Sequence, residues 1–214
     1  MESVDFLSSP LAPSEVVLLH GPQFAPPTEP GGRTAPFLDM PAISLPSLGE
    51  SLLAAALLAG EQAGTLVITQ GKRRILLGLF HRPTLYLQLG GTSGAWPAHS
   101  LEAQLHRQLS RGVTTPIALL PLLKGWQLPA ASWLGVIEGI QQGLTARGLL
   151  QLTQTRRPGM PAQRSYLIPS PTRALASNAP WPALQTLLTR CQQDRPDLWG
   201  QLMVSLHQLF AAKG

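Results

Sequence analysis

The stretch Gly64-Thr-Leu-Val-Ile-Thr-Gln-Gly-Lys-Arg-Arg74 resembles a second stretch of the same chain, Gly148-Leu-Leu-Gln-Leu-Thr-Gln-Thr-Arg-Arg157. When the two glycines are aligned, a Thr-Gln pair coincides and Lys72-Arg73 falls on Arg156-Arg157. An apolar run with helical spacing precedes each of the two stretches, and a second strand-like run follows each of them. The repeat therefore predicts two units, each a helix followed by a hairpin with a basic turn.

The first predicted unit spans residues 47–98. Ser47 followed by Glu50 has the spacing of a capping box and predicts a helix over 47–63, which Gly64 ends. A strand over 65–70 and a turn at Gly71-Lys72 should follow. Two further strands are expected over 73–80 and 84–89, separated by a break at His81-Arg82-Pro83.

The second predicted unit spans residues 99–168. Leu101, Leu105 and Leu109 form one apolar face of a helix over 100–112. A short helix over 117–123, interrupted by Pro121, and a turn over 127–131 lead to a long helix over 133–147 that Ser132 caps. Strands over 149–155 and 164–168 close the unit. This order of helix, short helix, turn, long helix and two-stranded wing is that of a winged helix.

The two ends of the chain complete the predicted organisation. Residues 1–46 contain nine of the 21 prolines and predict an extended, Pro-rich N-terminal arm, in which 15–20 forms a strand or a docking segment. Residues 169–214 are expected to hold a proline-marked linker over 169–182 and two closing helices over 184–193 and 197–212, with Asp197 as an N-cap. The predicted fold class is α+β, with tandem winged-helix-like units behind the arm.

Charge is scarce and unevenly placed. Charged residues make up 13% of the chain, about half the usual share of roughly 25%. Residues 1–50 hold six acids and one base, whereas residues 51–214 hold fifteen bases and five acids. The body therefore carries a net charge of +10, which attracts anionic partners or only aids solubility. A surface this poor in charge also favours a covering partner or self-association.

The sequence contains no pattern typical of catalysis or of metal binding. None of the five histidines is spaced as a metal ligand, no serine lies in a GxSxG motif, and the single cysteine, Cys191, lies on a predicted helix face. We therefore predict no catalytic, cofactor-binding or metal-binding residues, no cofactor, no enzymatic activity and no small-molecule substrate. The lone cysteine and an acidic N-terminus without a signal-peptide pattern predict a soluble protein of the cytoplasm.

Basic side chains are the candidate binding residues. Lys or Arg at the tip of a wing is suited to contact phosphates. The candidate residues for contact with an anion or nucleic acid are Lys72, Arg73, Arg74, Arg147, Arg156, Arg157 and Arg164. On the long helix the expected exposed positions are Glu138, Gln141, Gln142, Thr145 and Arg147, which give little electrostatic attraction to DNA. Gly135, Gly139 and Gly143 form a stripe on that helix that favours close packing of another helix.

The run from Ser47 to Leu175 resembles the Golgi-phosphoprotein-type family of phosphoinositide-binding peripheral proteins. The matching pieces are Leu52–Gly64 with the strand after it, and Val136–Gln142 leading into Ala146-Arg-Gly-Leu-Leu150. The resemblance implies a peripheral protein at an acidic membrane surface. The headgroup site of that family uses arginines on the long helix, where this chain has Glu138, Gln141 and Gln142, so that site is not carried over.

Three functions are consistent with these patterns. The first is a non-enzymatic interaction or scaffold protein with a protein partner, favoured by the low charge and the Pro-rich arm. The second is DNA binding through the basic wings, favoured by the charge of the body. The third is attachment to an acidic membrane surface. Arginines converging on one face favour the second or third function, and wings splayed apart favour the first.

Overall fold

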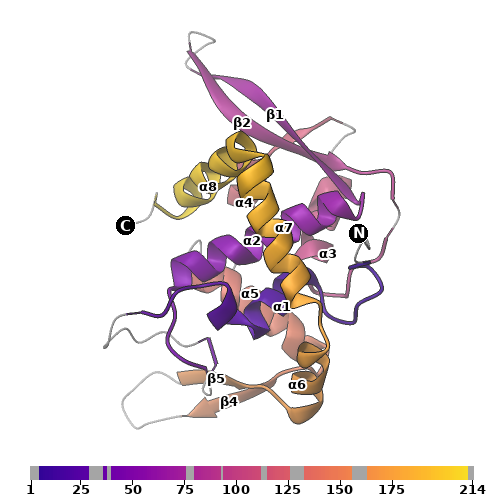
Figure 1. Ribbon diagram of the computed structural model, residues 1–214, viewed down its shortest axis with the longest axis vertical. Helices are drawn as coiled ribbons and strands as arrows, with labels where there is room; N and C mark the ends of the chain where they lie inside the picture. Colours follow the sequence, from indigo (N-terminus) through magenta and orange to yellow (C-terminus); the bar gives the residue numbers. More distant parts are fainter. Residues whose placement is uncertain are drawn as a thin grey trace.

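A computed structural model describes residues 5–28, 36–37, 40–75, 80–92, 94–111, 115–125, 133–155 and 163–211 (Figure 1). Helices and two small antiparallel sheets are mixed along the chain, so the predicted α+β class is confirmed. In chain order the described elements are α1 (Pro13–Leu19), the 3-10 helix η1 (Gly21–Gln23), α2 (Leu45–Gln62), β1 (Leu66–Ile75), β2 (Phe80–Leu89), α3 (Leu101–Arg111), β3 (Ile117–Ala118), α4 (Leu119–Gly125), α5 (Trp133–Ala146), β4 (Gln151–Thr155), β5 (Gln163–Leu167), α6 (Ser170–Ser177), α7 (Trp181–Asp194) and α8 (Pro196–Ala211).

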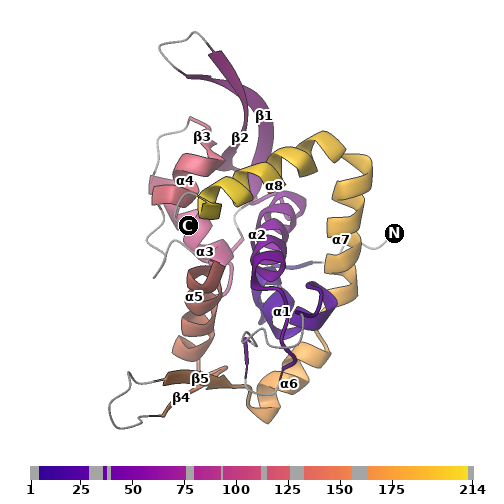
Figure 2. The same ribbon diagram turned by 90° about the vertical axis from the view of Figure 1, so that its left-hand side faces the viewer.

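The central element is α2, which contacts α1, α3, α5, α7, α8 and β1 (Figures 1 and 2). Its sequence is apolar around most of the helix, and a helix of that kind belongs in a core. Leu48, Leu52, Leu53 and Leu57 are fully enclosed there. All four segments predicted from the sequence contribute side chains to one continuous core cluster.

The expectation of an extended arm is wrong at α1. Every residue of this helix is buried, and α1 packs against α2. The local sequence favours a helix because Pro13 occupies the first turn, and Glu15 Oε2 accepts a hydrogen bond from the Ala12 N–H at 2.8 Å. Val16–Leu19 then supply apolar side chains for the core. The sequence pattern was too short to separate this helix from a strand.

The helix predicted over 47–63 is confirmed as α2, with a different N-terminus. Ser44, rather than Ser47, is the N-cap, and its Oγ accepts a hydrogen bond from the Ser47 N–H at 3.4 Å. Glu50 therefore takes no part in a capping box, and it pairs instead with His207 of α8. At the other end Gly64 has a φ of +69°, as a glycine that ends a helix requires.

The first hairpin is longer than the sequence predicted. β1 and β2 pair without interruption from Leu66 opposite Leu89 to Ile75 opposite Phe80. Gly71 is not in a turn, because it pairs with Thr84, and a side chain at Gly71 would collide with the ring of Tyr86. The strand break expected at residues 81–83 is also wrong. Lys72, Arg73 and Arg74 therefore lie along a strand and not at a basic turn.

The second unit follows the prediction more closely. The helices expected over 100–112 and 133–147 are α3 and α5, and the hairpin is β4 paired with β5. Gly148 ends α5 with a φ of +72°. Pro121 does not interrupt the short helix, because it lies in the first turn of α4, where its missing N–H has no helical partner to lose. Residues 127–131, predicted as a turn, lie outside the described residues.

The linker predicted over 169–182 is wrong where α6 forms. The hydroxyl of Thr172 in α6 donates to the Leu149 carbonyl at 2.7 Å, which ties this helix to the end of α5. The two closing helices are confirmed as α7 and α8, although α8 begins at Pro196, so Asp197 is inside its first turn rather than at its N-cap.

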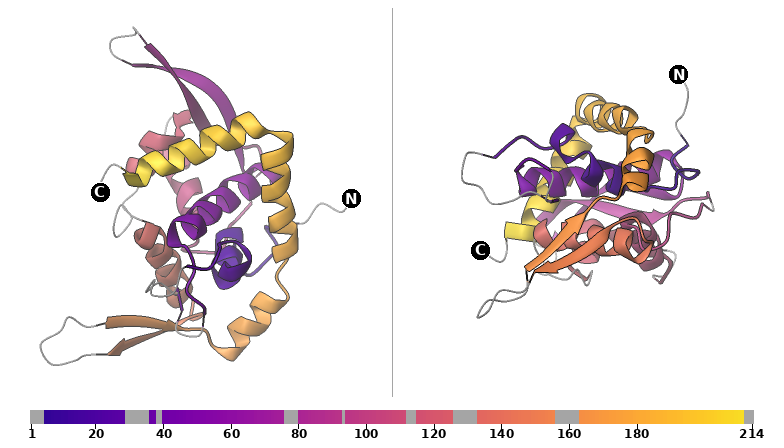
Figure 3. Two further views of the ribbon diagram at one scale, coloured as in Figure 1. Left: turned by 60° about the vertical axis from the view of Figure 1, so that its left-hand side comes forward. Right: turned by 90° about the horizontal axis from the view of Figure 1, so that it is seen from below.

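The two hairpins lie at opposite ends of the long axis of the molecule (Figures 1 and 2). β4 and β5 form a two-stranded ribbon that extends from the body beside α6 (Figure 3). At the other end, α8 packs against α4, α7 and β2 and runs across the molecule below the β1–β2 hairpin (Figures 2 and 3).

Candidate functional site

A groove of about 450 Å³ lies between the β1–β2 hairpin, the start of α4 and the first turns of α8. Its volume is in the range of sites that bind small ligands or peptide segments. We call it the hairpin groove, and its lining residues are Arg73, Arg82, Pro83, Thr84, Leu120, Pro121, Pro196, Asp197, Gly200, Gln201, Val204, Ser205 and Gln208.

Two arginines supply the positive charge of the groove. Arg73 on β1 and Arg82 on β2 are directly opposite each other in the antiparallel pair, so both side chains leave the sheet on the same side. Both are exposed, and neither forms an ion pair within the described part of the chain. Like charges placed directly opposite each other in a sheet are destabilising. An anion held between the two guanidinium groups would relieve that repulsion.

The opposite wall of the groove is largely apolar. Leu120 and Pro121 come from α4, and Val204 comes from α8 with 54% of its surface exposed. Among the polar groups, the Gln201 side-chain oxygen Oε1 is enclosed and accepts no hydrogen bond. A buried acceptor without a donor is costly. Because this oxygen has almost no accessible surface, a ligand in the groove does not reach it in this conformation.

Side chains that could act as a nucleophile or an acid are few in the described lining of the groove. Its one serine, Ser205, donates its hydroxyl to the Gln201 backbone carbonyl at 2.8 Å, as serines inside helices often do. Among the described lining residues Asp197 is the one acid, and none is a histidine or a cysteine. The nucleophile–base pair on which covalent catalysis depends is thus missing from the lining set.

The structure separates the predicted basic residues. Lys72 is exposed, but it is adjacent to Arg73 on β1, so its side chain points to the other face of the hairpin. Arg164 is exposed on β5, at the far end of the molecule. The Arg74 side chain, Arg156 and Arg157 lie outside the described residues. Among the predicted basic residues whose side chains are described, only Arg73 lines the hairpin groove.

Arg82 was missed because the sequence placed it in a strand break. The alternation of Leu85, Leu87 and Leu89 indicates a strand over 84–89. Because proline is uncommon inside strands, Pro83 indicated that the strand begins after it, whereas β2 begins at Phe80. Only the pairing of β2 with β1 shows that Arg82 faces Arg73. The α8 side of the groove has no local sequence signal.

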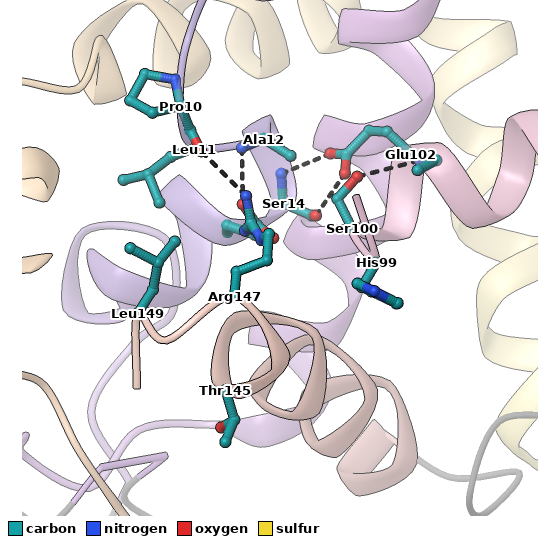
Figure 4. Close-up of polar contacts among 12 residues, drawn as sticks. Pro10, Leu11, Ala12, Ser14, His99, Ser100, Glu102, Thr145, Arg147 and Leu149 are labelled. Atoms are coloured by element: carbon teal, nitrogen blue, oxygen red, sulfur yellow. Dashed lines mark hydrogen bonds and ion pairs between the residues drawn. The ribbon is translucent and has the colours of Figure 1, made fainter. Parts of the chain in front are cut away.

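Arg147, predicted as a contact for an external anion, is engaged by groups of this chain. Its guanidinium contacts the carboxylate of Glu15 and donates to the Pro10 carbonyl at 3.1 Å (Figure 4). The Glu15 side chain is completely enclosed. Gln141, also expected to be exposed on α5, is buried and donates from Nε2 to the Pro36 carbonyl at 2.6 Å. The end of α5 therefore holds the N-terminal segment in place.

A second buried carboxylate, Glu102 on α3, holds the same segment from the other side. Its two oxygens accept hydrogen bonds from the Ser14 backbone N–H at 2.7 Å and from the Ser14 hydroxyl at 2.8 Å (Figure 4). Burial and, to a smaller extent, the charge of the nearby Glu15 raise the pKa of Glu102 to about 7, although the hydrogen bonds from Ser14 oppose this shift. Burial also raises the pKa of Glu15, although Arg147 opposes that shift. Because both carboxylates are enclosed and bonded within the chain, we assign the network a structural role.

Other candidate features are also accounted for by packing. Cys191 is buried, and burial raises the pKa of its thiol, so it is a packed side chain rather than a nucleophile. A Cβ at Gly143 would lie 2.4 Å from the His99 carbonyl oxygen. The lack of a side chain at Gly143 therefore makes room for the backbone of the loop at His99, and not for another helix as the glycine stripe predicted. Among the described residues no group of three His, Cys, Asp or Glu side chains is placed to hold a metal ion.

Comparisons with known proteins found no matching family, no matching curated protein and no matching solved structure. No helix in the described ranges combines the length and the apolar character that crossing a membrane demands.

Proposed function

We propose that this chain is a non-enzymatic interaction protein, built on winged-helix-like units, that holds a protein partner in the hairpin groove. The observation that carries the proposal is the pair of unpaired arginines, Arg73 and Arg82, facing an apolar wall that includes an exposed valine. Interfaces combine buried apolar anchors with a few oriented charges in this way, and Arg is enriched in them.

The separation of the two hairpins supports this proposal over DNA binding. A protein that tracks DNA neutralises a row of phosphates with Lys and Arg on one surface. Here the exposed Arg73 and Arg164 lie on hairpins at opposite ends of the molecule. Arg147, which would have added to such a surface, is already engaged by Glu15. DNA binding through the wings remains the alternative, because Lys72, Arg73 and Arg82 are exposed together on one hairpin.

Attachment to an acidic membrane surface is the third candidate, and it follows from the family resemblance stated above. It would use the same exposed cations of the β1–β2 hairpin. The long helix supports it less, because Gln141 and Arg147 both bind the N-terminal segment.

Affinity capture with paired variants tests the proposal. The full-length protein is used as bait beside Arg73→Ala/Arg82→Ala and beside Arg164→Ala, which removes an exposed arginine at the other end. We expect a protein that is retained by the wild type and by Arg164→Ala and is lost by the groove variant. Equal recovery with all three baits would remove the groove from the interaction. Light scattering on the same samples identifies self-association.

Anisotropy of random duplex DNA at low and physiological salt tests the alternative. Micromolar binding that weakens steeply with salt, and that is abolished when Arg73, Arg74, Arg156 and Arg157 are replaced by Ala, would replace our proposal with phosphate contact by the wings. Pelleting with phosphatidylserine vesicles tests the membrane candidate with the same variant.

A further inference from the structure

We propose that the hairpin groove binds an acidic peptide segment, with a carboxylate between Arg73 and Arg82 and an aliphatic side chain against the wall that Leu120 and Val204 form. This inference rests on the proposed function and names the chemistry of the partner. Two separate observations in the described structure support this ligand: the paired cations and the apolar wall.

The cations require an anionic group. Arg73 and Arg82 project from paired positions on adjacent strands and have no carboxylate partner in the described structure. A guanidinium donates through a planar fork that matches the two oxygens of a carboxylate. A glutamate or aspartate side chain, or a chain-terminal carboxylate, satisfies both arginines at once.

The apolar wall distinguishes a peptide from a simple anion. An inorganic anion has no apolar group to place against Leu120 and Val204. One peptide segment can place a carboxylate on the arginines and an aliphatic side chain on this wall.

The wall and the charge balance favour a peptide over a nucleic acid. Leu120 and Val204 offer apolar contact, which an aliphatic side chain of the ligand would cover. The charged groups among the described lining residues, two arginines and Asp197, carry a net charge of +1. A phosphate backbone with one charge per nucleotide needs more cations than this.

Asp197 provides a sharp prediction, because among the described lining residues it is the one whose negative charge would repel an anion. Replacing it with asparagine keeps its size and removes its charge. We expect Asp197→Asn to tighten the binding of an acidic peptide about two- to fivefold, which corresponds to the weak interaction of charges close to solvent.

Fluorescence anisotropy with a short labelled Gly/Ser peptide that carries a Leu-Glu-Glu-Leu core tests the proposal on the full-length protein. The matched probe has a Leu-Gln-Gln-Leu core. We expect Arg82→Gln to weaken binding of the glutamate peptide at least about tenfold and Arg164→Gln to leave it unchanged. Binding should also decrease as salt is raised.

The outcomes separate the inference from the function on which it rests. Equal binding of the glutamate and glutamine peptides, or binding of neither, overturns the acidic-peptide proposal. If affinity capture still finds a partner that depends on Arg73 and Arg82, the proposed function stands with a different ligand chemistry. Tighter binding of duplex DNA than of the glutamate peptide overturns both. Thermal unfolding of each variant verifies that these surface substitutions leave the fold intact.

Discussion

Glu102 shows how one residue can fix the position of a segment far away in the sequence. It is enclosed between α3 and α1, and it binds both the N–H and the hydroxyl of Ser14. These hydrogen bonds compensate only part of the cost of burying a charge, so the carboxyl group holds its proton to unusually high pH. The neighbouring Glu15 and Arg147 form an ion pair that completes the network.

The titration of Glu102 should make the protein less stable as the pH rises. The folded state holds this proton more tightly than the unfolded chain, whose ordinary value is 4.5. This contribution is fully present below about pH 4.5 and is lost as the pH rises to about 7, with a total loss of about 3 kcal/mol. Urea unfolding of the wild type and Glu102→Gln between these limits measures it. The variant should lack this loss, whereas Asp194→Asn at the exposed end of α7 should retain it.

Arg147 should be needed for stability and not for binding. Arg147→Met leaves the enclosed Glu15 carboxylate without its cation, and we expect a loss of about 3–5 kcal/mol in the free energy of unfolding. The double variant Glu15→Gln/Arg147→Met should recover part of that loss, because the buried charge is then absent. A double-mutant cycle from chemical denaturation gives the coupling. If the two losses simply add, the ion pair contributes nothing to stability.

At the scale of elements, close approaches of backbone explain glycines that a sequence pattern leaves ambiguous. Gly143 in α5 lies against the loop that precedes α3, so the two elements are closer than any side chain allows. A Cβ built on Gly200 in α8 would meet open space, so the packing does not require a glycine there. The same residue type therefore has opposite consequences in two helices.

Alanine substitutions at these two positions should change stability in opposite directions. Gly143→Ala places a Cβ 2.4 Å from the His99 carbonyl oxygen, and we expect a destabilisation of about 1–3 kcal/mol. Gly200→Ala meets no atom and should stabilise α8 by about 0.5–1 kcal/mol through the lower entropy of the unfolded chain. Thermal unfolding compares them directly. A destabilised Gly200→Ala would show that this glycine has a role that its surroundings do not reveal.

At the scale of the whole molecule, one core joins segments that the sequence presents as separate. α1 lies against α2, and α7 contacts both helices, so the two ends of the chain enclose the middle. The hairpins project from opposite ends of this body (Figure 1). This arrangement leaves the hairpin groove as a surface of its own, apart from the β4–β5 ribbon.

Leu18 distinguishes this architecture from an arm that lies loosely on the surface. The Leu18 side chain is fully buried. Leu18→Ala should therefore destabilise the protein by about 2–5 kcal/mol, as truncation of a core leucine does. Chemical denaturation monitored by tryptophan fluorescence provides the measurement, and Leu7→Ala, at a half-buried position before α1, provides the comparison. A loss within about 0.5 kcal/mol for Leu18→Ala would instead indicate a surface segment.

The sequence by itself determined the α+β class, the helices α2, α3 and α5 to within a few residues, and the presence of two hairpins, because apolar periodicity and terminal glycines are local signals. It misplaced α1, α6 and the length of the first hairpin, because burial and strand pairing depend on partners that are distant in the chain. The candidate site was decided by the tertiary structure. Arg73 was visible in the sequence, but its pairing with Arg82 and the wall supplied by α8 exist only once β2 and α8 have packed together.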